Sequence, residues 1–478
     1  MGVAKQNLPQ PVFPGINDIA AGAGESLDPN FRPNVVDSFD VTIQRQLTNR
    51  VTMEVGYIGR LIDHEYQPIN INAVPYMMTK GGQTFAQAYA NVETAMKCNV
   101  SAAACGAAGV PTVAAQPFFE AALSGTGFCT GFANCTTAVV NKQFGNFQNQ
   151  AVWDLWSALD QGGTSPGFNF GCSMLNCPIA TSASGQLTSG VGVNASIGHG
   201  NYNAGFVSLR MNDWRGLTLQ QNLTYSKALG TGAFVQATSG YTADDPFDLD
   251  KMYGVQGFDR TWVYNIFAVY QPPFYKNQQG LVGHLLGGWD IGTIFTAGSG
   301  EPLFCNTLTG ADFQGGSGAQ GFGGADNVDF NDTENCIFTG KSSPSNSVHK
   351  NVAGGTDSFG NNVGTSTAGT GNAALNMFSN PVAVYSQVRS PILGIDNRAG
   401  GVGSFRGMPY WNMDLSLKKK FRITERFNSE FQVVFTNVLN HNQFFDPLLD
   451  LQTPSAFGVL NSQGNNPRQM EFGLRVSF

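Results

Sequence analysis

The chain has 478 residues, with 26 Lys and Arg against 33 Asp and Glu, and a formal net charge of −7. This acidic balance argues against nucleic acid as a partner, because phosphate binding needs a basic face, and no run approaches the roughly 18 apolar residues of a membrane helix. Charged residues make up only 12% of the chain, against roughly 25% in soluble globular proteins. Because the chain is also rich in aromatic residues (12%) and in glycine (59 residues), we expect an ordered, β-rich protein in an unusual solvent.

Residues 1–36 precede the first recognisable strand and carry no secretory signal. The segment Met1–Pro14 contains one Lys and three Pro but no apolar stretch. A signal peptide needs a basic region, an apolar region and a small-residue cleavage site. We therefore expect either a cytosolic protein or a chain that lacks its natural beginning.

Alternation of apolar and polar residues predicts nine β-strands, because successive side chains of a strand point to opposite faces. In the last of them, Met470, Phe472 and Leu474 fall on one face, with polar residues or glycine between them. In chain order the predicted strands are Asp37–Leu47, Val51–Arg60, Tyr202–Met211, Leu217–Tyr225, Thr261–Gln271, Trp289–Thr296, Trp411–Leu417, Phe427–Phe435 and Arg468–Phe478.

The connections between these strands alternate between short and long. The long ones lie at about 61–201, 226–260, 297–408 and 439–467. Soluble domains rarely contain structureless loops beyond about 15 residues, whereas outer-membrane barrels join strands of about ten residues by short periplasmic turns and long extracellular loops. The sequence thus predicts an all-β fold, an antiparallel transmembrane β-barrel over 37–478, with 1–36 as an extracellular loop or the start of a fragment.

A soluble β-sandwich with one packed face is the alternative fold. Loop length, low charge and strand length all agree better with the barrel. Bacterial single-chain barrels have an even number of strands, and nine leaves one strand unaccounted for. We therefore expect strands upstream of this chain, or an unrecognised strand within 1–36 or 61–200.

The eight cysteines all lie outside the predicted strands. Eight cysteines allow 105 pairings, and sequence proximity favours the pairs Cys98–Cys105, Cys129–Cys135, Cys172–Cys177 and Cys305–Cys336. Disulfides that close long loops indicate an oxidising compartment. Zinc binding at 172 and 177 is the alternative, but no His or second close cysteine pair accompanies these two. An extracytoplasmic chain without a signal peptide is expected to be a fragment.

The two faces of the predicted strands divide into lipid-facing and lumen-facing residues. Met413, Leu415 and Leu417, and the apolar residues from Met470 to Phe478, are expected to face lipid. Polar residues on the other face either line a substrate path or contact a plug, or are simply the polar half of a barrel strand. These lumen-facing candidates are Gln220, Asn222, Thr224, Asp414, Glu430, Gln432, Glu471 and Arg475.

The sequence offers little support for catalysis or for a bound cofactor. The five histidines are scattered, and no acid, base and nucleophile cluster together. Two acidic clusters in the expected extracellular loops have the oxygen ligands that Ca²⁺ prefers, but neither matches an EF-hand, and a solvated acidic loop is the alternative. Their members are Asp244, Asp245, Asp248 and Asp250, and then Asp326, Asp329, Asp332 and Glu334.

Four segments carry a family resemblance. Residues 409–478 begin PYWNMDLSLKKKFRITERFNSEFQ and end RQMEFGLRVSF, and the other segments are DSFDVTIQRQLTNRVTMEVGYIG (37–59), FDRTWVYNIFA (258–268) and LLGGWDIGTIFTAGSGEP (285–302). In this order they resemble the C-terminal part of TonB-dependent receptor barrels. The similarity is closest to the Oar-like group, whose members carry an N-terminal carboxypeptidase-regulatory-like domain.

The resemblance implies an outer-membrane barrel of about 22 strands with a plugged lumen, which takes up a bulky nutrient and is energised by TonB from the periplasm. The chain shows no TonB box, no plug and about half of the strands, so TonB would act through a missing N-terminal region. The resemblance also implies the outer membrane lipid and the barrel-assembly machinery as partners, with Phe478 similar to the terminal assembly signal. The alternative function is a non-transporting surface protein whose disulfide-stapled loops mediate adhesion or assembly.

Overall fold

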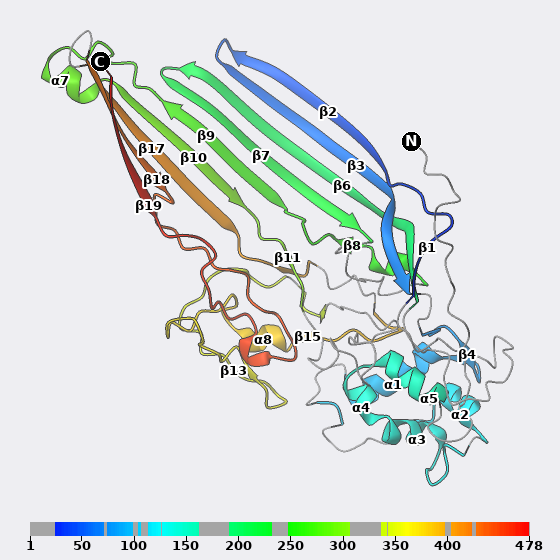
Figure 1. Cartoon of the computed structure of the whole chain (residues 1–478). Helices are drawn as coiled ribbons and strands as arrows, with labels where there is room; N and C mark the ends of the chain where they lie inside the picture. The colour runs from blue at the N-terminus through cyan, green and yellow to red at the C-terminus, as the bar shows by residue number, and fades with distance from the viewer. Residues whose placement is uncertain are drawn as a thin grey trace.

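The computed structural model describes residues 24–70, 74–98, 104–106, 113–125, 127–161, 191–231, 247–305, 336–341, 343–396, 403–422 and 427–477 of the chain. Its largest feature is one antiparallel β-sheet, with the long connections gathered at one end of the strands (Figure 1). No helix among these residues is long and apolar enough to cross a membrane.

Nine long strands form this sheet as a meander, in which each long strand pairs with the next one along the chain. They are β2 (Val35–Thr48), β3 (Val51–Asn70), β6 (Val191–Trp214), β7 (Leu217–Gly230), β9 (Trp262–Tyr270), β10 (Trp289–Gly298), β17 (Tyr410–Arg422), β18 (Asn428–Thr436) and β19 (Gln469–Ser477). Two short strands lie off this path. β1 (Gly24–Leu27) runs parallel to the start of β6, and β8 (Gly254–Val255) pairs with the end of β7.

Each of the nine predicted strands is present, which confirms the antiparallel all-β fold. The predicted boundaries of two long loops were wrong, because β3 continues to Asn70, β6 begins at Val191 and β7 continues to Gly230. In these outer ends Gly, Asn, His and acidic residues replace the strict apolar alternation of the strand centres. Alternation is required only in the part of a strand where one face meets hydrocarbon, which we call the apolar band. Beyond the apolar band the sequence need not alternate, so it does not indicate where the strand ends.

The cross-strand register sorts the side chains into two faces. On the apolar face, one continuous row crosses seven strands through Ile43, Val55, Val207, Leu223, Tyr264, Ala297 and Trp411. One residue further along, a row on the polar face crosses the same strands through Gln44, Glu54, Ser208, Asn222, Asn265, Thr296 and Asn412. A one-residue slip in any strand would exchange these faces, so the two-faced pattern fixes the register.

Polar side chains on the apolar face have partners within the sheet. The hydroxyl of Tyr264 donates to Oε1 of Gln221 at 3.1 Å. The hydroxyl of Tyr57 donates to Oδ1 of Asn203 in the same way. Polar groups that face an apolar medium must be hydrogen-bonded, and Gln221, the one exception to the alternation in its strand, meets this requirement.

The short connections gather at the end of the sheet opposite to the long loops (Figure 1). Lys419 lies on the apolar face of β17, opposite Trp289 at the start of β10. Its Nζ donates to the backbone carbonyls of Leu285 and Gly287, at the end of helix α7 (Gly280–Leu286), and lies 5.0 Å from the ring centroid of Trp289. A lysine whose stem covers apolar surface while its charged end reaches polar groups is typical of a membrane interface.

Five described helices in the connection from β3 to β6 form a small module with its own core. After the hairpin β4 (Thr79–Lys80) and β5 (Gln83–Thr84), they are α1 (Phe85–Met96), α2 (Pro117–Leu123), α3 (Cys135–Lys142), α4 (Phe144–Gln148) and α5 (Val152–Gln161). Phe85 and Trp156 are fully buried in its centre, with ring centroids 4.9 Å apart. Disulfides join Cys98 to Cys105 and Cys129 to Cys135, and Cys98, Cys105 and Cys135 are buried in this core. The sequence did not predict these helices.

Glu93 lies inside the helical module and is completely buried. Neither carboxyl oxygen has a hydrogen-bond partner of good geometry among the described residues. Burial raises the pKa of Glu93 well above its ordinary value, while interactions with Gln150 and Tyr89 lower the pKa by less. Burial therefore favours the neutral, protonated form of this side chain.

A second core joins the connections from β10 to β17 and from β18 to β19. A disulfide links Cys305 to Cys336, and Phe378, Phe405 and Phe457 pack beside it. Cys172 and Cys177 lie outside the described residues. The short elements here are β11 (Pro302–Leu303), β12 (Ile337–Phe338), β13 (Gly355–Thr356), β14 (Asn362–Val363), α8 (Pro381–Tyr385), β15 (Val388–Arg389), β16 (Phe405–Arg406) and the 3₁₀ helix η6 (Pro454–Ala456).

The sheet is open at both edges in the part of the chain that the structure describes. β2 and β19 each pair with a single neighbour, and every residue of both strands is exposed. An edge strand presents a row of unpaired N–H and C=O groups. Such a row is not tolerated in hydrocarbon, so both edges require further strands if the sheet crosses a membrane.

The facing of β19 can be tested with two adjacent arginines. We expect Leu474→Arg, on the apolar face, to lower the free energy of unfolding of the protein in bilayers by about 2–4 kcal/mol, because a charge near the bilayer midplane is costly. Gly473→Arg is the control, since a Cβ there meets nothing closer than the Cβ of Gln432 at 3.9 Å. Urea titration of the protein in lipid vesicles measures both, and equal tolerance of the two changes would contradict the facing.

The buried carboxyl of Glu93 predicts a pH dependence of stability. An unfolded glutamate ionises above its ordinary pKa of about 4.3, whereas the folded side chain keeps its proton to a higher pH. Stability should therefore fall as the pH rises from this value towards the folded pKa. Calorimetry across that range should show the fall in the wild type and a flatter profile, with a higher melting temperature at pH 7, in Glu93→Gln.

Glu120 in the same module is the matched control for Glu93. Its carboxylate accepts hydrogen bonds from the backbone N–H of Cys135 and from the N–H and hydroxyl of Thr136. Glu120→Gln should therefore lower the melting temperature at neutral pH, because it weakens charge-assisted hydrogen bonds. A destabilised Glu93→Gln variant at pH 7 would show that Glu93 is ionised in the folded protein.

Candidate functional site

A groove of about 570 Å³ lies on the polar face, away from the long loops. Two neighbouring cross-strand rows form it, one from Arg210 through Gln220, Phe267 and Ile294 to Asp414, and the other from Thr218 through Val269, Gly292 and Ser416 to Val434. The first row has polar side chains at both ends and apolar ones in the middle, and the second begins with Thr218 and has Ser416 next to its terminal Val434. The groove therefore offers hydrogen-bonding groups on two sides of an apolar floor.

Asp414 is the acidic group at one side of this groove. Its Oδ1 accepts a hydrogen bond from Nδ2 of Asn412 at 2.8 Å and from the backbone N–H of Asn437 at 2.9 Å. The backbone carbonyl of Asp414 accepts from the hydroxyl of Thr293 at 3.0 Å. Asp414 is thus held in place by β10, by its own strand β17 and by the residue that follows β18.

Charged residues of the polar face cluster beside the groove, near the short turns, and they are paired. Nζ of Lys418 lies 3.2 Å from Oε1 of Glu430, and Nζ of Lys420 lies 3.5 Å from Oδ2 of Asp290. Arg475 lies directly opposite Glu430 in the register. Because opposite charges are paired across neighbouring strands, this part of the polar face is charged but has little net charge.

The eight lumen-facing candidates share the polar face. Gln220 and Asp414 line the groove, and Asn222 and Thr224 continue from Gln220 along β7. Gln432, Glu430, Glu471 and Arg475 lie on β18 and β19, and Nε2 of Gln432 donates to Oγ of Ser416 at 3.3 Å. The structure brings Glu430 and Arg475 together across one strand pair but leaves the β7 residues several strands away. That this face borders a lumen stays a prediction.

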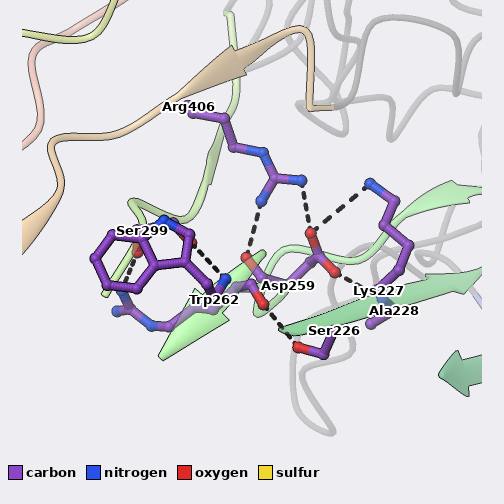
Figure 2. Close-up of polar contacts among 8 residues, drawn as sticks. Ser226, Lys227, Ala228, Asp259, Trp262, Ser299 and Arg406 are labelled. Atoms are coloured by element: carbon purple, nitrogen blue, oxygen red, sulfur yellow. Dashed lines mark hydrogen bonds and ion pairs between the residues drawn. The ribbon is translucent and has the colours of Figure 1, made fainter. Parts of the chain in front are cut away.

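At the loop end of the sheet, Asp259 connects three segments that are far apart in the sequence (Figure 2). Its side chain is almost completely buried, and Oδ2 lies 2.6 Å from Nη2 of Arg406, in β16, and 3.7 Å from Nζ of Lys227, in β7. Oδ1 accepts from the backbone N–H of Ala228 at 2.6 Å, and Nη1 of Arg406 donates to the backbone carbonyl of Asp259 at 3.0 Å. Asp259 thus anchors the loops to the strands.

The neighbouring Arg260 ties the ends of β9 and β10 together. Its Nη1 donates to the carbonyl of Ser299 at 2.8 Å, and its Nη2 lies 2.7 Å from Oε1 of Glu301. The backbone N–H of Trp262 donates to Oγ of Ser299, and the hydroxyl of Ser226 donates to the carbonyl of Arg260 (Figure 2). Sequence reasoning assigned no role to Asp259, Arg260 or Arg406, although charged residues are scarce in this chain.

The remaining predicted sites are only partly covered by the described residues. Phe478 lies outside them, as do Asp244, Asp245 and the second acidic cluster at 326–334. Of the first cluster, Asp248 and Asp250 are described, and Oδ1 of Asp250 lies 3.6 Å from Nε2 of His199. Within the described ranges, no group of three or more His, Cys, Asp or Glu side chains is arranged to hold a metal ion. A Ca²⁺ site in these loops stays a prediction.

Two comparisons with known proteins address the family of the chain. A family model described as "Outer membrane beta barrel domain" matches residues 3–471, which is nearly the whole chain. Among curated proteins, none matches.

Several solved structures of outer membrane proteins are similar to the chain. The outer membrane transporter YddB from Escherichia coli has 8% identity and a TM-score of 0.35, with 95% of this chain and 34% of that chain covered. The ferric-catecholate import receptor Fiu from E. coli K12 has 9% identity and a TM-score of 0.32, with 97% and 30% covered. The pyoverdine receptor FpvA from Pseudomonas aeruginosa PAO1 has 8% identity and a TM-score of 0.32, with 95% and 31% covered. This chain spans about a third of their length.

Removing the charge of Asp259 should release the loops from the strands. We expect Asp259→Asn to destabilise this end of the sheet by about 3 kcal/mol, because the positive charge of Arg406 would remain partly buried without its partner. Hydrogen exchange at the amide of Ala228, which donates to Asp259, should then be roughly 100-fold faster. Glu301→Gln, which breaks a partly exposed ion pair, should change this rate little. Equal rates in both variants would show that Asp259 does not anchor the loops.

Proposed function

The chain belongs to the outer membrane β-barrel family and is located in the outer membrane, and from that premise we propose that it supplies nine consecutive strands of a larger barrel that imports a bulky nutrient. The observation that carries the proposal is the continuous polar row across seven strands, backed by an apolar row one residue away. A sheet with these two faces separates lipid from an aqueous lumen.

The open edges of the sheet support a larger barrel. β2 and β19 have no second neighbour among the described residues, and backbone groups in hydrocarbon must be paired. Further strands of a longer polypeptide would close the barrel at both edges. Barrels of about 22 strands enclose a plugged lumen wide enough for a large solute, and a lumen of that size suits a bulky nutrient better than a small one.

The proposed mode of transport is energised import through a plugged lumen. The segments 37–59, 258–268, 285–302 and 409–478 resemble TonB-dependent receptor barrels, and they contain all or part of every long strand of the sheet except β6 and β7. TonB would then act from the periplasm on a plug that precedes these strands. The barrel-assembly machinery and the outer membrane lipid are the other proposed partners, and catalysis is not part of the proposal.

One observation favours a second function, namely surface adhesion or assembly. The helical module between β3 and β6 has its own core and two disulfides, so it is a folded unit and not merely a connection between two strands. A compact module at the loop end of the strands could present a surface to other cells or proteins. In that case the protein would not transport, and its loss would change attachment instead of uptake.

Obstruction of the polar face tests the proposal. Gly292 lines the groove, and a Cβ there meets only the Cβ of Ser416 at 3.7 Å, so Gly292→Trp should fill the groove without breaking the sheet. Gly205 is on the apolar face with open space around it, and Gly205→Trp is the matched control. We expect the first change to lower uptake at least about tenfold and the second to leave it unchanged.

The measurement uses cells that produce the natural polypeptide and a panel of fluorescein-labelled oligosaccharides and oligopeptides too large for porins. Uptake by the wild type should exceed that of a gene-deletion strain and should stop when a protonophore removes the proton-motive force. Uptake that persists in the deletion strain for every probe, together with a loss of surface attachment, would contradict import and favour adhesion.

A further inference from the structure

A second cavity, of about 330 Å³, lies at the loop end of the polar face. It shares no lining residue with the groove near the turns. Its charged, amide and aromatic lining residues include Arg60 and Glu65 of β3, Tyr202 of β6, and Gln256 and Phe258 from the connection between β7 and β9, while Ile58 and Ile62 of β3 are among its apolar lining residues. Its volume is at the lower end of the range of small-molecule sites.

Gln256 and Asn201 both line this cavity and each has a buried side-chain atom without a hydrogen-bond partner among the described residues, the amide nitrogen of Gln256 and Oδ1 of Asn201. Gln256 is 7% exposed, and its Nε2 is buried with no hydrogen-bond acceptor among the described residues. A Cβ at the facing Gly230 would lie 2.6 Å from this nitrogen, so the glycine leaves the room that the amide occupies. A buried donor without an acceptor is unfavourable and rare in native proteins, so a ligand that brought an acceptor to this nitrogen would be stabilised by it.

The backbone around Gln256 is fixed before anything binds. Its N–H donates to the carbonyl of Ala228 at 3.1 Å, and its own carbonyl accepts from the N–H of Asp259 at 2.9 Å. Asp259 is in turn held by Arg406. The side chain of Gln256 therefore extends from a rigid turn, which reduces the entropy lost on binding.

Two charged residues line the cavity beside Gln256: Glu65 is a negatively charged hydrogen-bond acceptor, and Arg60 is a positively charged donor. The carboxylate of Glu65 accepts no hydrogen bond from a described residue, and its Oε2 lies 3.8 Å from the position that a Cβ on Gly200 would take. Glu65 is in the outer part of β3, beyond the apolar band, and burial raises the pKa of its carboxyl while His199 lowers it by less. Arg60 is exposed and forms no ion pair with a described residue.

Two aromatic rings border the same cavity. The side chain of Phe258 is 69% exposed, which is unusual for phenylalanine, and Tyr202 is half-buried. An exposed ring beside polar groups suits a ligand that has an apolar face and a polar edge. Phe258 lies one residue before Asp259, so it has the same rigid anchor as Gln256.

The chemistry of these five side chains selects among ligand classes. An amide donor, a guanidinium donor and a carboxylate acceptor satisfy hydroxyl groups, which both donate and accept. Glu65 would repel a phosphate, an aliphatic ligand would leave Gln256 without an acceptor, and one carboxylate beside an arginine is a poor cation site. A sugar ring presents hydroxyls at its edge and C–H groups on its faces, and these match both the polar groups and the rings.

We propose that this cavity binds one hexose or pentose unit of an oligosaccharide at the outer end of the barrel. Gln256 donates to a ring hydroxyl, Glu65 accepts from another, and Phe258 stacks on the sugar face. The remaining units of the chain extend along the polar face towards the groove. The assignment rests on the proposed function, because it names the class of nutrient that the importer would take.

Direct binding to the purified protein tests this site without any transport step. Protein extracted in detergent from outer membranes is titrated in a calorimeter with maltohexaose, cellohexaose and xylohexaose, and with a hexapeptide and inorganic phosphate as other ligand classes. We expect at least one hexasaccharide to bind and the peptide and phosphate not to bind. Binding of none of the sugars to the folded protein, or binding of peptide or phosphate alone, would overturn the proposal.

Two variants place the sugar in the cavity. Gln256→Met keeps the length of the side chain but removes its donor, and it should raise the Kd about tenfold, while Phe258→Ala should weaken binding through the loss of stacking. Gln44→Met makes the same change on the polar face of β2 and should leave the Kd unchanged. Equal affinities of Gln256→Met and Gln44→Met would overturn the site. Sugar binding that persists in a protein unable to import would contradict the proposed function alone.

Discussion

The structure depends on one constraint, which is that hydrocarbon offers no hydrogen-bond partner to a polypeptide backbone. The nine-stranded meander meets it in its interior, where seven strands have long neighbours on both sides. The same constraint explains why one face is continuously apolar, why Gln221 and Asn203 on that face are paired with tyrosine hydroxyls, and why the edges at β2 and β19 call for further strands. The register and the two faces are thus consequences of the solvent.

Beyond the apolar band the constraint no longer applies, and the chain is held together by other interactions. Here the structure contains helices, disulfides and two apolar cores of ordinary globular character. Asp259 connects these loops to the sheet through Arg406 and Lys227. Gln256 and Phe258 lie within three residues of Asp259. The contacts of Asp259 that hold the loops therefore also position the cavity at the loop end of the polar face. Structural and binding roles therefore meet in one short segment.

The nine strands could be predicted from the sequence because alternation is a local signal that each strand carries by itself. The partners of Asp259 could not, since Arg406 is 147 residues away and only the folded loops bring the two together. The helical module could be predicted less readily than the strands but more readily than the partners of Asp259. Phe85, Tyr89, Val92 and Met96 have helical spacing after a Thr84–Gln87 capping box, but the Gly- and Ala-rich surroundings concealed this pattern. Gln256 gave no signal, because an unsatisfied amide is defined only by its burial.

The central claim is that this sheet crosses the bilayer with one face in lipid and the other in water. Spin labels placed singly at positions 413 to 417 of β17, in protein reconstituted into lipid vesicles, test it most directly. Relaxation by oxygen, which concentrates in lipid, should be strong at 413, 415 and 417, and relaxation by a water-soluble nickel chelate should be strong at 414 and 416. Accessibility to the nickel chelate at all five positions, without alternation, would contradict the claim.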